Sequence, residues 1–477
     1  MFKKIRVLLA AVFFVCITLL FLDFTGTLHA WLGWMAKIQF LPAMLAANTA
    51  VIAVLILVTV LCGRIYCSTI CPLGVMQDMI SWIPGKIKKK NRLRFRYTPE
   101  RKWLRYSFLV VFIIMLCLGI HSLAVLIAPY SAYGRIASNI LAPLYQWGNN
   151  ALAWIAERAE SYAFYEKKVW IRSIPTFITA VATFVILFIM AWKGGRTYCN
   201  TVCPVGTILG FFARRSIFSP VIDKSLCNSC GLCEKQCRAS CIDSSGHSID
   251  YSRCVSCMDC IETCNHGAIS LGSRYSQKDK GTDTGRRAFL TALAITGTAT
   301  ACKAHGKQAH EGGTHLVPAG AVSLKNMTDR CTACQLCISA CPNNVLRPSS
   351  SLTTLMQPEM SYDKGFCRPE CNKCSEVCPT GAIRPVTVEE KSSIQIGHAV
   401  VDLDLCVVNT DDVSCGNCAR HCPAQAIMMV SSPSDNSRKV PAVDESRCIG
   451  CGACEYLCPA RPVSAIHVEG HHVHKMI

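Results

Sequence analysis

Four stretches of the chain are apolar over about the length that a helix needs to cross a bilayer, roughly 20 residues. The rest of the chain is polar and rich in cysteine, so the sequence predicts a membrane part followed by a soluble part. The basic start also suits a signal peptide, but no small-residue cleavage site follows the first stretch. We therefore predict an α-helical membrane domain with four transmembrane helices, at residues 7–24, 42–61, 106–128 and 174–192.

Basic residues in the connecting loops orient these helices. The loop 63–105 has eleven Lys and Arg against two acidic residues, whereas the loop 129–173 has five against three. Because cytoplasmic loops carry the basic excess, the first loop and the segment after the fourth helix are expected in the cytoplasm. The amphipathic segment 144–165 is expected on the outward-facing membrane surface. This topology also accounts for the net charge of +18, so no nucleic-acid partner is predicted.

A twelve-residue motif occurs twice, as GRIYCSTICPLG at 63–74 and GRTYCNTVCPVG at 195–206. Each copy follows the second helix of a pair, so domain 1–206 is predicted to be a duplicated two-helix unit. Pseudo-symmetry brings four cysteines to one depth, and Cys-x3-Cys sets two thiols one helical turn apart. Such thiols can pack helix ends, hold a cluster or metal, or form a redox dithiol near a quinone. The tentative redox or cofactor motif consists of Cys67, Cys71, Cys199 and Cys203.

Two cysteine runs in residues 207–272 have the Cys-x2-Cys-x2-Cys-x3-Cys spacing of bacterial two-cluster ferredoxins, in which the fourth cysteine ligates the other cluster. Zinc sites use two well-separated Cys-x2-Cys pairs, which the doubled three-cysteine runs do not match. Cys241 is surplus and is expected to be a buried free thiol. The expected ligand sets are Cys227, Cys230, Cys233 and Cys264 for one [4Fe-4S] cluster and Cys254, Cys257, Cys260 and Cys237 for the other.

Residues 273–325 are predicted to be a linker that contains RRAFLTALAITGTATAC at 286–302. The Arg pair before an apolar stretch is typical of a twin-arginine export signal. A linker helix on the inner membrane surface is the alternative, and a lipid on Cys302 is a third interpretation. Three evenly spaced histidines after it, His305, His310 and His315, are interpreted as part of a solvated tether.

Four more cysteine runs in residues 326–477 predict a four-cluster ferredoxin domain, which brings the total to six [4Fe-4S] clusters. We predict nested pairing, run one with run four and run two with run three. The clusters would make this domain acidic, which suits docking on a basic patch of a redox partner. The predicted sets are Cys331, Cys334, Cys337 with Cys458; Cys448, Cys451, Cys454 with Cys341; Cys367, Cys371, Cys374 with Cys422; and Cys406, Cys415, Cys418 with Cys378.

With these motifs, residues 1–272 resemble the NapH family of membrane quinol dehydrogenases, and residues 285–477 resemble the NapG family of four-cluster exported ferredoxins. The wider group includes MauN and MauM and the membrane polyferredoxins NosR and CcoG. The resemblance implies that a quinol is oxidised in the membrane and that electrons pass through clusters to a periplasmic reductase, such as nitrate reductase. It also implies a multi-pass protein of the bacterial inner membrane, in contact with lipid and the quinone pool.

The sequence predicts an electron carrier without a haem or dinucleotide motif, since it has no Cys-x-x-Cys-His and no Gly-x-Gly-x-x-Gly. Two other functions stay open: maturation or regulation of a metal centre, as in the CcoG and NosR proteins, and a non-catalytic cluster scaffold. His29 and His121 fall toward the outer leaflet but are more typical of helix-end polar residues than of quinone ligands. Residues 207–272 are expected in the cytoplasm, whereas residues 303–477 are periplasmic only if the export signal acts.

Overall fold

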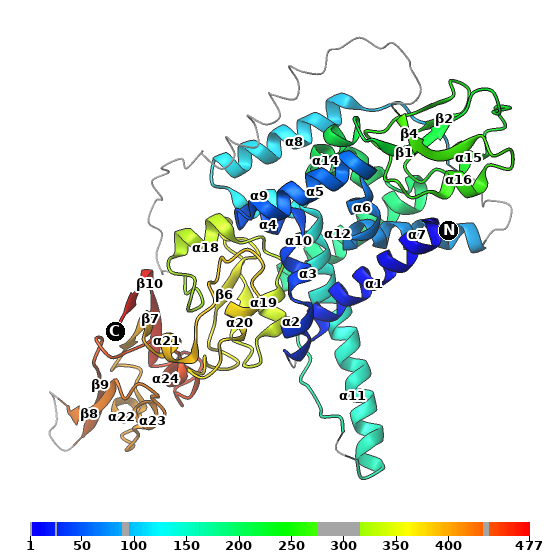
Figure 1. The fold of residues 1–477 in the computed structure, drawn as a ribbon. Helices are drawn as coiled ribbons and strands as arrows, with labels where there is room; N and C mark the ends of the chain where they lie inside the picture. The colour runs from blue at the N-terminus through cyan, green and yellow to red at the C-terminus, as the bar shows by residue number, and fades with distance from the viewer. Residues whose placement is uncertain (1, 24–25, 88–94, 162, 275–314, 433–437) are drawn as a thin grey trace.

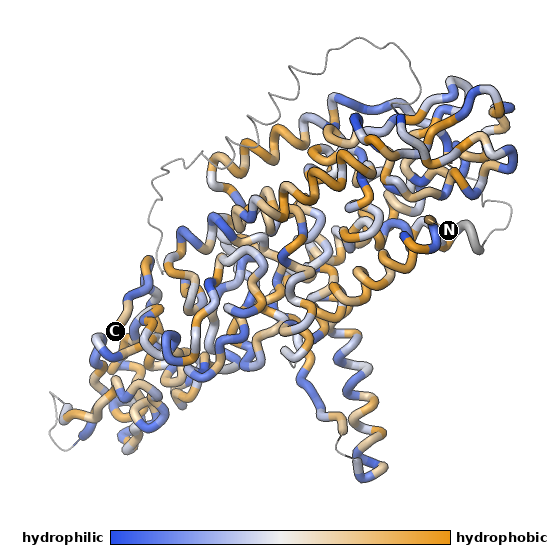
Figure 2. Tube along the Cα trace, viewed as in Figure 1, coloured by the Kyte–Doolittle hydropathy of each residue, from blue (hydrophilic) through white to orange (hydrophobic). Residues whose placement is uncertain are grey.

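A helical part lies between two ferredoxin-like regions in the computed structural model, which describes residues 2–23, 26–87, 95–161, 163–274, 315–432 and 438–477 (Figure 1). The first ferredoxin-like region is at one end of the molecule and the second is at the other. Figure 2 shows apolar residues concentrated along the helices of the middle part, with polar and apolar residues mixed at both ends.

The helical part consists of helices of very different lengths. Its elements are α1 (Phe2–Leu22), α2 (Thr27–Leu32), α3 (Trp34–Lys37), α4 (Phe40–Leu45), α5 (Thr49–Cys62), α6 (Ile65–Thr69), α7 (Pro72–Ile87), α8 (Lys102–Cys117), α9 (His121–Ala124), η2 (Val125–Ile127), α10 (Pro129–Ile136), η3 (Ala137–Leu141), α11 (Ala142–Arg158), α12 (Ile174–Gly194), α13 (Thr197–Thr201) and α14 (Pro204–Ala213).

Two of the four expected membrane helices are long and apolar enough to cross a bilayer within the described ranges: α1 and α12, with 21 residues each. The expected helix 42–61 is divided into α4 and α5, because Ala47 has a left-handed φ of 54° and the Asn48 side chain caps α5. The expected helix 106–128 stops at the end of α8, just before Gly119 with φ of 75°. Among the described residues, two of the four expected helices therefore have the full length of a membrane span.

The two copies of the repeat have the same local structure. In each, a five-residue helix, α6 or α13, is followed by a proline that begins the next helix, α7 or α14. Proline suits the first helical position because its fixed φ is helical and it has no N–H to satisfy there. Pro72 and Pro204 therefore start new helices instead of ending the motif.

The first ferredoxin-like region is built from two short antiparallel strand pairs and two one-turn helices. Strand β1 pairs with β4, and β2 pairs with β3. The elements are β1 (Phe218–Ile222), α15 (Leu232–Gln236), β2 (Ile242–Asp243), β3 (Ser248–Ile249), α16 (Asp259–Thr263) and β4 (Ile269–Ser273).

The second ferredoxin-like region divides into two modules, one before and one after residue 394. In the first, β5 pairs with β6; in the second, β8 pairs with β9 and β10 pairs with β7, all antiparallel. The elements are α18 (Leu324–Arg330), α19 (Leu336–Ala340), β5 (Leu346–Pro348), β6 (Pro358–Met360), α20 (Lys373–Glu376), α21 (Val388–Ser392), β7 (Ile394–Val401), α22 (Val407–Thr410), α23 (Asn417–Arg420), β8 (Ile427–Ser431), β9 (Lys439–Val443), α24 (Ala453–Tyr456) and β10 (Ile466–Met476).

Helix α1 contacts both ferredoxin-like regions, one at each of its ends. At its start, Lys3 Nζ lies 3.2 Å from Asp259 Oδ1 and 3.0 Å from Glu262 Oε2 of the first region. Just beyond its end, a Cβ built on Gly26 would lie 3.1 Å from Lys373 Nζ of the second region. Because a 21-residue helix is about 30 Å long, the two regions are separated by roughly the thickness of a hydrocarbon core.

Candidate metal centres

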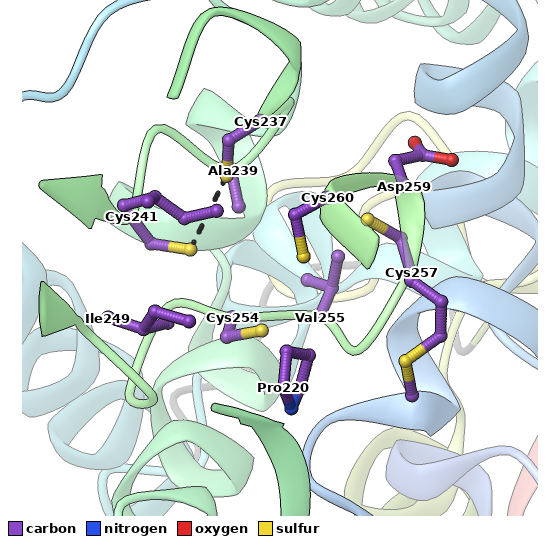
Figure 3. Close-up of a pocket in the computed structure, with 12 residues that line it drawn as sticks. Pro220, Cys237, Ala239, Cys241, Ile249, Cys254, Val255, Cys257, Asp259 and Cys260 are labelled. Atoms are coloured by element: carbon purple, nitrogen blue, oxygen red, sulfur yellow. Dashed lines mark hydrogen bonds between the residues drawn. The ribbon is translucent and has the colours of Figure 1, made fainter. Parts of the chain in front are cut away.

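In the first ferredoxin-like region, the cysteines expected to share a cluster line common cavities. One cavity is lined by Cys227, Cys230, Cys233 and Cys264. A second is lined by Cys237, Cys254, Cys257 and Cys260, whose side chains surround one space in Figure 3. The exchange of the fourth cysteine between the two runs is therefore the arrangement that the structure has.

Left-handed residues bend the loops around these cavities. Ser229 and Gly231 have positive φ between the first three cysteines of the first run, and Ser256 and Met258 have it at the equivalent places in the second. Such residues turn the backbone so that consecutive N–H groups point inward. The Cys-x2-Cys-x2-Cys spacing thus produces a loop that surrounds a multi-atom group.

The surplus Cys241 is buried, as expected, but it lies at the second cavity. Its Sγ is 3.5 Å from Cys237 Sγ. The hydrogen bond between them lowers the pKa of the Cys237 thiol to about 7. Sequence reasoning missed this contact, although the Cys-x3-Cys spacing of the pair was visible.

In the second ferredoxin-like region the structure groups the cysteines differently from the nested prediction. Run one lies with run two in one core, and run three lies with run four in another. Cys458 and Cys378 therefore belong to different modules from the runs predicted to use them. The fourth cysteine is instead exchanged between consecutive runs, as it is in the first region.

Neighbouring thiols identify each set. Burial and then other thiolates, Cys378 among them, raise the pKa of Cys331 and Cys337, and Cys341 acts in the same way on Cys374. The structure therefore makes neighbours of these thiols: Cys331, Cys334, Cys337 with Cys378; Cys367, Cys371, Cys374 with Cys341; Cys406, Cys415, Cys418 with Cys458; and Cys448, Cys451, Cys454 with Cys422.

The two modules meet at cysteines. The backbone N–H of Cys367 donates to the carbonyl of Cys451 at 2.9 Å. A ligand loop of the first module thus contacts a ligand loop of the second.

The two copies of the repeat bring their four cysteines together. Cys67, Cys71, Cys199 and Cys203 are each at most 5% exposed and lie in one core. Burial raises the pKa of Cys203, and the charges of the other three thiols raise it further. Packing of helix ends, one of the open interpretations, does not by itself require four thiols at one place.

The arginine of each copy donates a hydrogen bond to the other copy. Arg64 Nη2 donates to the carbonyl of Cys199 at 3.1 Å, and Arg196 Nη1 donates to the carbonyl of Cys67 at 2.6 Å. Both guanidinium groups also lie 3.9 Å from the Sγ of the cysteine three residues on, Cys67 and Cys199. This reciprocal exchange is what a pseudo-twofold axis between the copies produces.

The described residues include no group of three or more His, Cys, Asp or Glu side chains close enough to hold a single metal ion. A tetrahedral zinc site has four ligands at about 2.0–2.3 Å from one ion. A [4Fe-4S] cube instead spreads its four thiolates around a larger core. The donor chemistry of the seven thiol sets, four thiolates each, fits iron–sulfur clusters.

The four-thiol group of the repeat lies between the two ferredoxin-like regions. Toward the first region, Arg64 Nη1 donates to the carbonyl of Ser252 at 2.9 Å and Asn200 Nδ2 donates to that of Ala239 at 3.1 Å. Toward the second, Asn139 Nδ2 donates to Gln335 Oε1 at 2.7 Å. One core contains these thiols together with those of the first C-terminal module.

A larger cavity lies where the helical part meets the second ferredoxin-like region. Burial lowers the pKa of Arg172, and the thiol charges of Cys341 and Cys337 of that region partly offset this effect. The lining residues include aromatic, amide and basic side chains: Phe21, Asn139, Gln146, Trp147, Lys167, Trp170, Arg172, Phe177, Ser339 and Asn344.

The two histidines considered as quinone ligands do not line this cavity. His29 Nδ1 is 3.2 Å from Asp23 Oδ2, and His121 Nε2 is 3.9 Å from Asp329 Oδ1. The Arg286–Arg287 pair, Cys302, His305 and His310 lie outside the described residues, and His315 pairs with Glu359 at 3.3 Å.

Comparison with known proteins agrees with iron–sulfur chemistry. The family described as "4Fe-4S binding domain" matches residues 46–91 and 176–223, which contain the two copies of the repeat. The family described as "4Fe-4S dicluster domain" matches residues 253–345 and 413–461. No solved structure matches.

Several curated ferredoxin-type proteins are similar to this chain. The ferredoxin-type protein NapG of Escherichia coli is 30% identical over 189 residues, which are 36% of this chain and 81% of that protein. The chain belongs to this ferredoxin-type family. NapF of Escherichia coli is 31% identical over 142 residues, 30% of this chain and 78% of that protein.

The methylamine utilization ferredoxin-type protein MauM of Methylobacillus flagellatus is 31% identical over 155 residues. The match covers 30% of this chain and 64% of that relative, so the chain spans under two thirds of its length. As a member of the ferredoxin-type family, the chain contains 4Fe-4S binding domains.

Proposed function

We propose that this protein is a membrane-anchored electron carrier that oxidises a quinol and delivers the electrons through [4Fe-4S] clusters to a reductase partner. The observation that carries the proposal is the position of α1, whose two ends contact the two ferredoxin-like regions. If α1 crosses the bilayer, one region lies on the cytoplasmic side and the other on the opposite side. Clusters at both ends of one core then provide a path across the membrane.

The proposed topology keeps the N-terminus and residues 207–272 in the cytoplasm. Helices α1 and α12 span the membrane, and α5 and α8, which are shorter at 14 and 16 residues, complete a four-helix part. Residues 303–477 are then periplasmic. An exported acidic domain would dock on a basic patch of its partner.

The proposed quinol site is the cavity at the junction with the second ferredoxin-like region. Its aromatic side chains, Trp147, Trp170 and Phe177, suit a flat ring, and Asn139 and Lys167 offer polar groups for the ring oxygens. Arg172 connects the cavity to the thiols of Cys337 and Cys341. A quinol oxidised here loses two electrons and two protons, and the electrons leave one at a time through that module.

Proteoliposomes that contain only the full chain test this function. We expect a menaquinol analogue to drive the reduction of a dye acceptor. The variant Arg172→Gln should slow the reaction or raise the KM for quinol, whereas Arg158→Gln, an exposed arginine that stacks on Trp154, should not. Reduction of cupric ion in place of the dye would favour metal-centre maturation, and neither reaction would favour a scaffold.

The side of the membrane is tested separately. A C-terminal tag should be digested by protease in intact spheroplasts, and a tag at the N-terminus should be protected. A protected C-terminal tag would contradict the proposed path across the membrane while leaving the cluster sets untouched.

A further inference from the structure

We propose that Cys67, Cys71, Cys199 and Cys203 hold a seventh [4Fe-4S] cluster, which connects the first ferredoxin-like region with the second. The ligand set rests on the geometry of the two repeats alone. Only its role as a relay rests on the proposed electron path.

The first argument is charge. Arg64 and Arg135 are both 0% exposed. Within the described ranges their side chains donate only to amide or carbonyl oxygens and, for Arg64, to the Cys67 thiol. A buried cation without an anion is costly. Arg135 also lies close to the site, because its charge acts on the Tyr198 ring that adjoins Cys199 and Cys203. A cube with four thiolates carries a charge of about −2 in its oxidised form and would balance these two cations.

The second argument is the set of donors aimed at sulfur. The N–H of Gly206 donates to Cys203 Sγ at 3.3 Å, and Gln77 Nε2 donates to Cys199 Sγ at 3.3 Å. A backbone N–H of Gly74 acts on Cys71 in the same way. Hydrogen bonds to the sulfurs are one of the means by which proteins tune iron–sulfur clusters. Thiols that only fill space would not need donors from both copies.

The third argument is that the site lies close to both ferredoxin-like regions. Arg64 acts on the thiols of both Cys67 and Cys254, so the site adjoins a ligand of the first region. On the other side, α10 separates it from the second region, and a Cβ on Gly134 of α10 would lie 2.3 Å from the carbonyl of Cys334. Tyr130 of the same helix is close to Cys334 and Cys378. The site therefore lies between a ligand loop of the first region and α10, the helix that contacts a ligand loop of the second.

As a relay, the site accepts one electron from a reduced cluster on one side and passes one electron to an oxidised cluster on the other. No bond is made or broken, and no proton is required. The surrounding arginines hold the site at a positive potential, which favours its reduced form.

Metal analysis of the full chain, purified from membranes without oxygen, tests the ligand set. The wild type should contain about 28 iron atoms and as many acid-labile sulfides, against about 24 for six clusters. The double variant Cys67→Ala/Cys199→Ala should lose about four of each. The control Cys16→Ala, a half-buried thiol of α1, should lose none.

A second variant keeps the proposal testable if the double variant does not fold. Arg64→Gln removes a buried cation, so one cluster signal in a redox titration followed by electron paramagnetic resonance should move to lower potential, with the iron count unchanged. Arg64→Lys, which keeps the charge, should restore most of the shift.

Three outcomes would overturn the assignment: about 24 iron atoms in the wild type, zinc in place of iron, or a Cys67–Cys199 dithiol that is alkylated without loss of iron. None of them depends on quinol. Failure of quinol-driven dye reduction with about 28 iron atoms present would instead reject the proposed function and leave this site in place.

Discussion

The two copies of the repeat are nearly identical in sequence but differ in how their arginines are neutralised. Arg196 forms a two-pronged ion pair with Asp78, from Nε to Oδ1 at 2.8 Å and from Nη2 to Oδ2 at 2.7 Å. Arg64, the equivalent residue, has no carboxylate partner in the part of the chain that the structure describes. The residue of the second copy that corresponds to Asp78 is Gly210, which has no carboxylate to offer.

Gly210 makes room for a different arrangement. A Cβ there would lie 2.0 Å from Arg105 Nη2 and 2.5 Å from the carbonyl of Ser252. Arg105 instead pairs with Glu100 at 2.7 Å and shares the Ser252 carbonyl with Arg64. The two copies therefore form a symmetric shell around the four thiols, and the difference at one position lets each side contact a different neighbour.

The largest effect is expected when Asp78 is removed. Asp78→Ala leaves the buried Arg196 without its carboxylate and also removes the contacts of Arg6 at 3.4 Å and Arg238 at 3.5 Å. Loss of one partner of a buried ion pair costs about 3–5 kcal/mol. Thermal unfolding of the detergent-solubilised protein should show a large drop in melting temperature, or the protein should not accumulate.

Asp223→Ala is the matched control, since that exposed carboxylate bonds only within its own turn. Equal melting temperatures for the two variants would mean that the ion-pair network does not stabilise the repeat.

The symmetry itself is tested by filling the two glycines that end the motif. A Cβ on Gly74 would lie 2.2 Å from the Cys67 carbonyl and 2.6 Å from Arg196 Nη1, and one on Gly206 would lie 2.3 Å from the Cys199 carbonyl and 2.8 Å from Arg64 Nη2. Each Gly→Ala change should destabilise by about 3 kcal/mol, the upper range for overpacking. Comparable losses of melting temperature are expected for both.

Gly148→Ala on α11 provides the control, because nothing lies within 4 Å of its Cβ position. It should be neutral or slightly stabilising, since alanine favours a helix over glycine. A loss confined to one of the two repeat glycines would contradict the reciprocal contact.

Acid should affect one copy more than the other. Burial alone would raise the pKa of Asp78, but the charges of Arg196 and Arg238 and the hydrogen bond from Arg196 outweigh it and hold the pKa at about 2. Since the folded value is below the unfolded 3.8, the stabilisation is fully present above about pH 4 and is lost as the pH falls toward 2, by about 2 kcal/mol. The difference in melting temperature between wild type and Asp78→Asn should therefore shrink over that range.

A difference that stays constant down to pH 2 would indicate that Asp78 acts through packing and not through its charge. Because acid destroys iron–sulfur clusters, the wild type and Asp78→Asn should be compared in their cluster-free forms.

The sequence predicted that the repeat thiols meet, because the spacing of the two motifs determines it. Cys-x3-Cys-Pro twice, each time after an apolar stretch, was enough to expect the thiols of Cys67 and Cys199 at one depth, and the structure places them together. The arginine contacts were not predictable, because they join residues more than 120 positions apart through carbonyl groups. The only sequence signal for a buried role was that both copies of the motif contain an arginine at this position, Arg64 and Arg196.

The structure differs from the sequence prediction in the pairing of the cysteine runs and in the lengths of two membrane helices. The nested pairing joined run one with run four and run two with run three. Exchange of the fourth cysteine needs neighbouring loops in one core, and consecutive runs share a core. The lengths of the expected membrane helices were overestimated because apolar residues continue past Ala47 and Gly119, where the backbone turns left-handed. Hydropathy does not register such a turn.

The smallest difference between the copies is expected at their tyrosines. Tyr66 Oη donates to Gln39 Oε1 at 3.0 Å and accepts from the Phe40 N–H at 3.1 Å, whereas Tyr198 Oη donates only to the carbonyl of Ile127 at 2.6 Å. Tyr66→Phe leaves two buried groups without this partner and Tyr198→Phe leaves one. Since an unsatisfied buried group costs about 1–3 kcal/mol, Tyr66→Phe should be more destabilising by about 1 kcal/mol. Parallel melting curves of the two variants measure this difference. A larger drop in melting temperature for Tyr198→Phe would mean that the hydroxyl of the second copy, which donates to Ile127 just before α10, is the more important one.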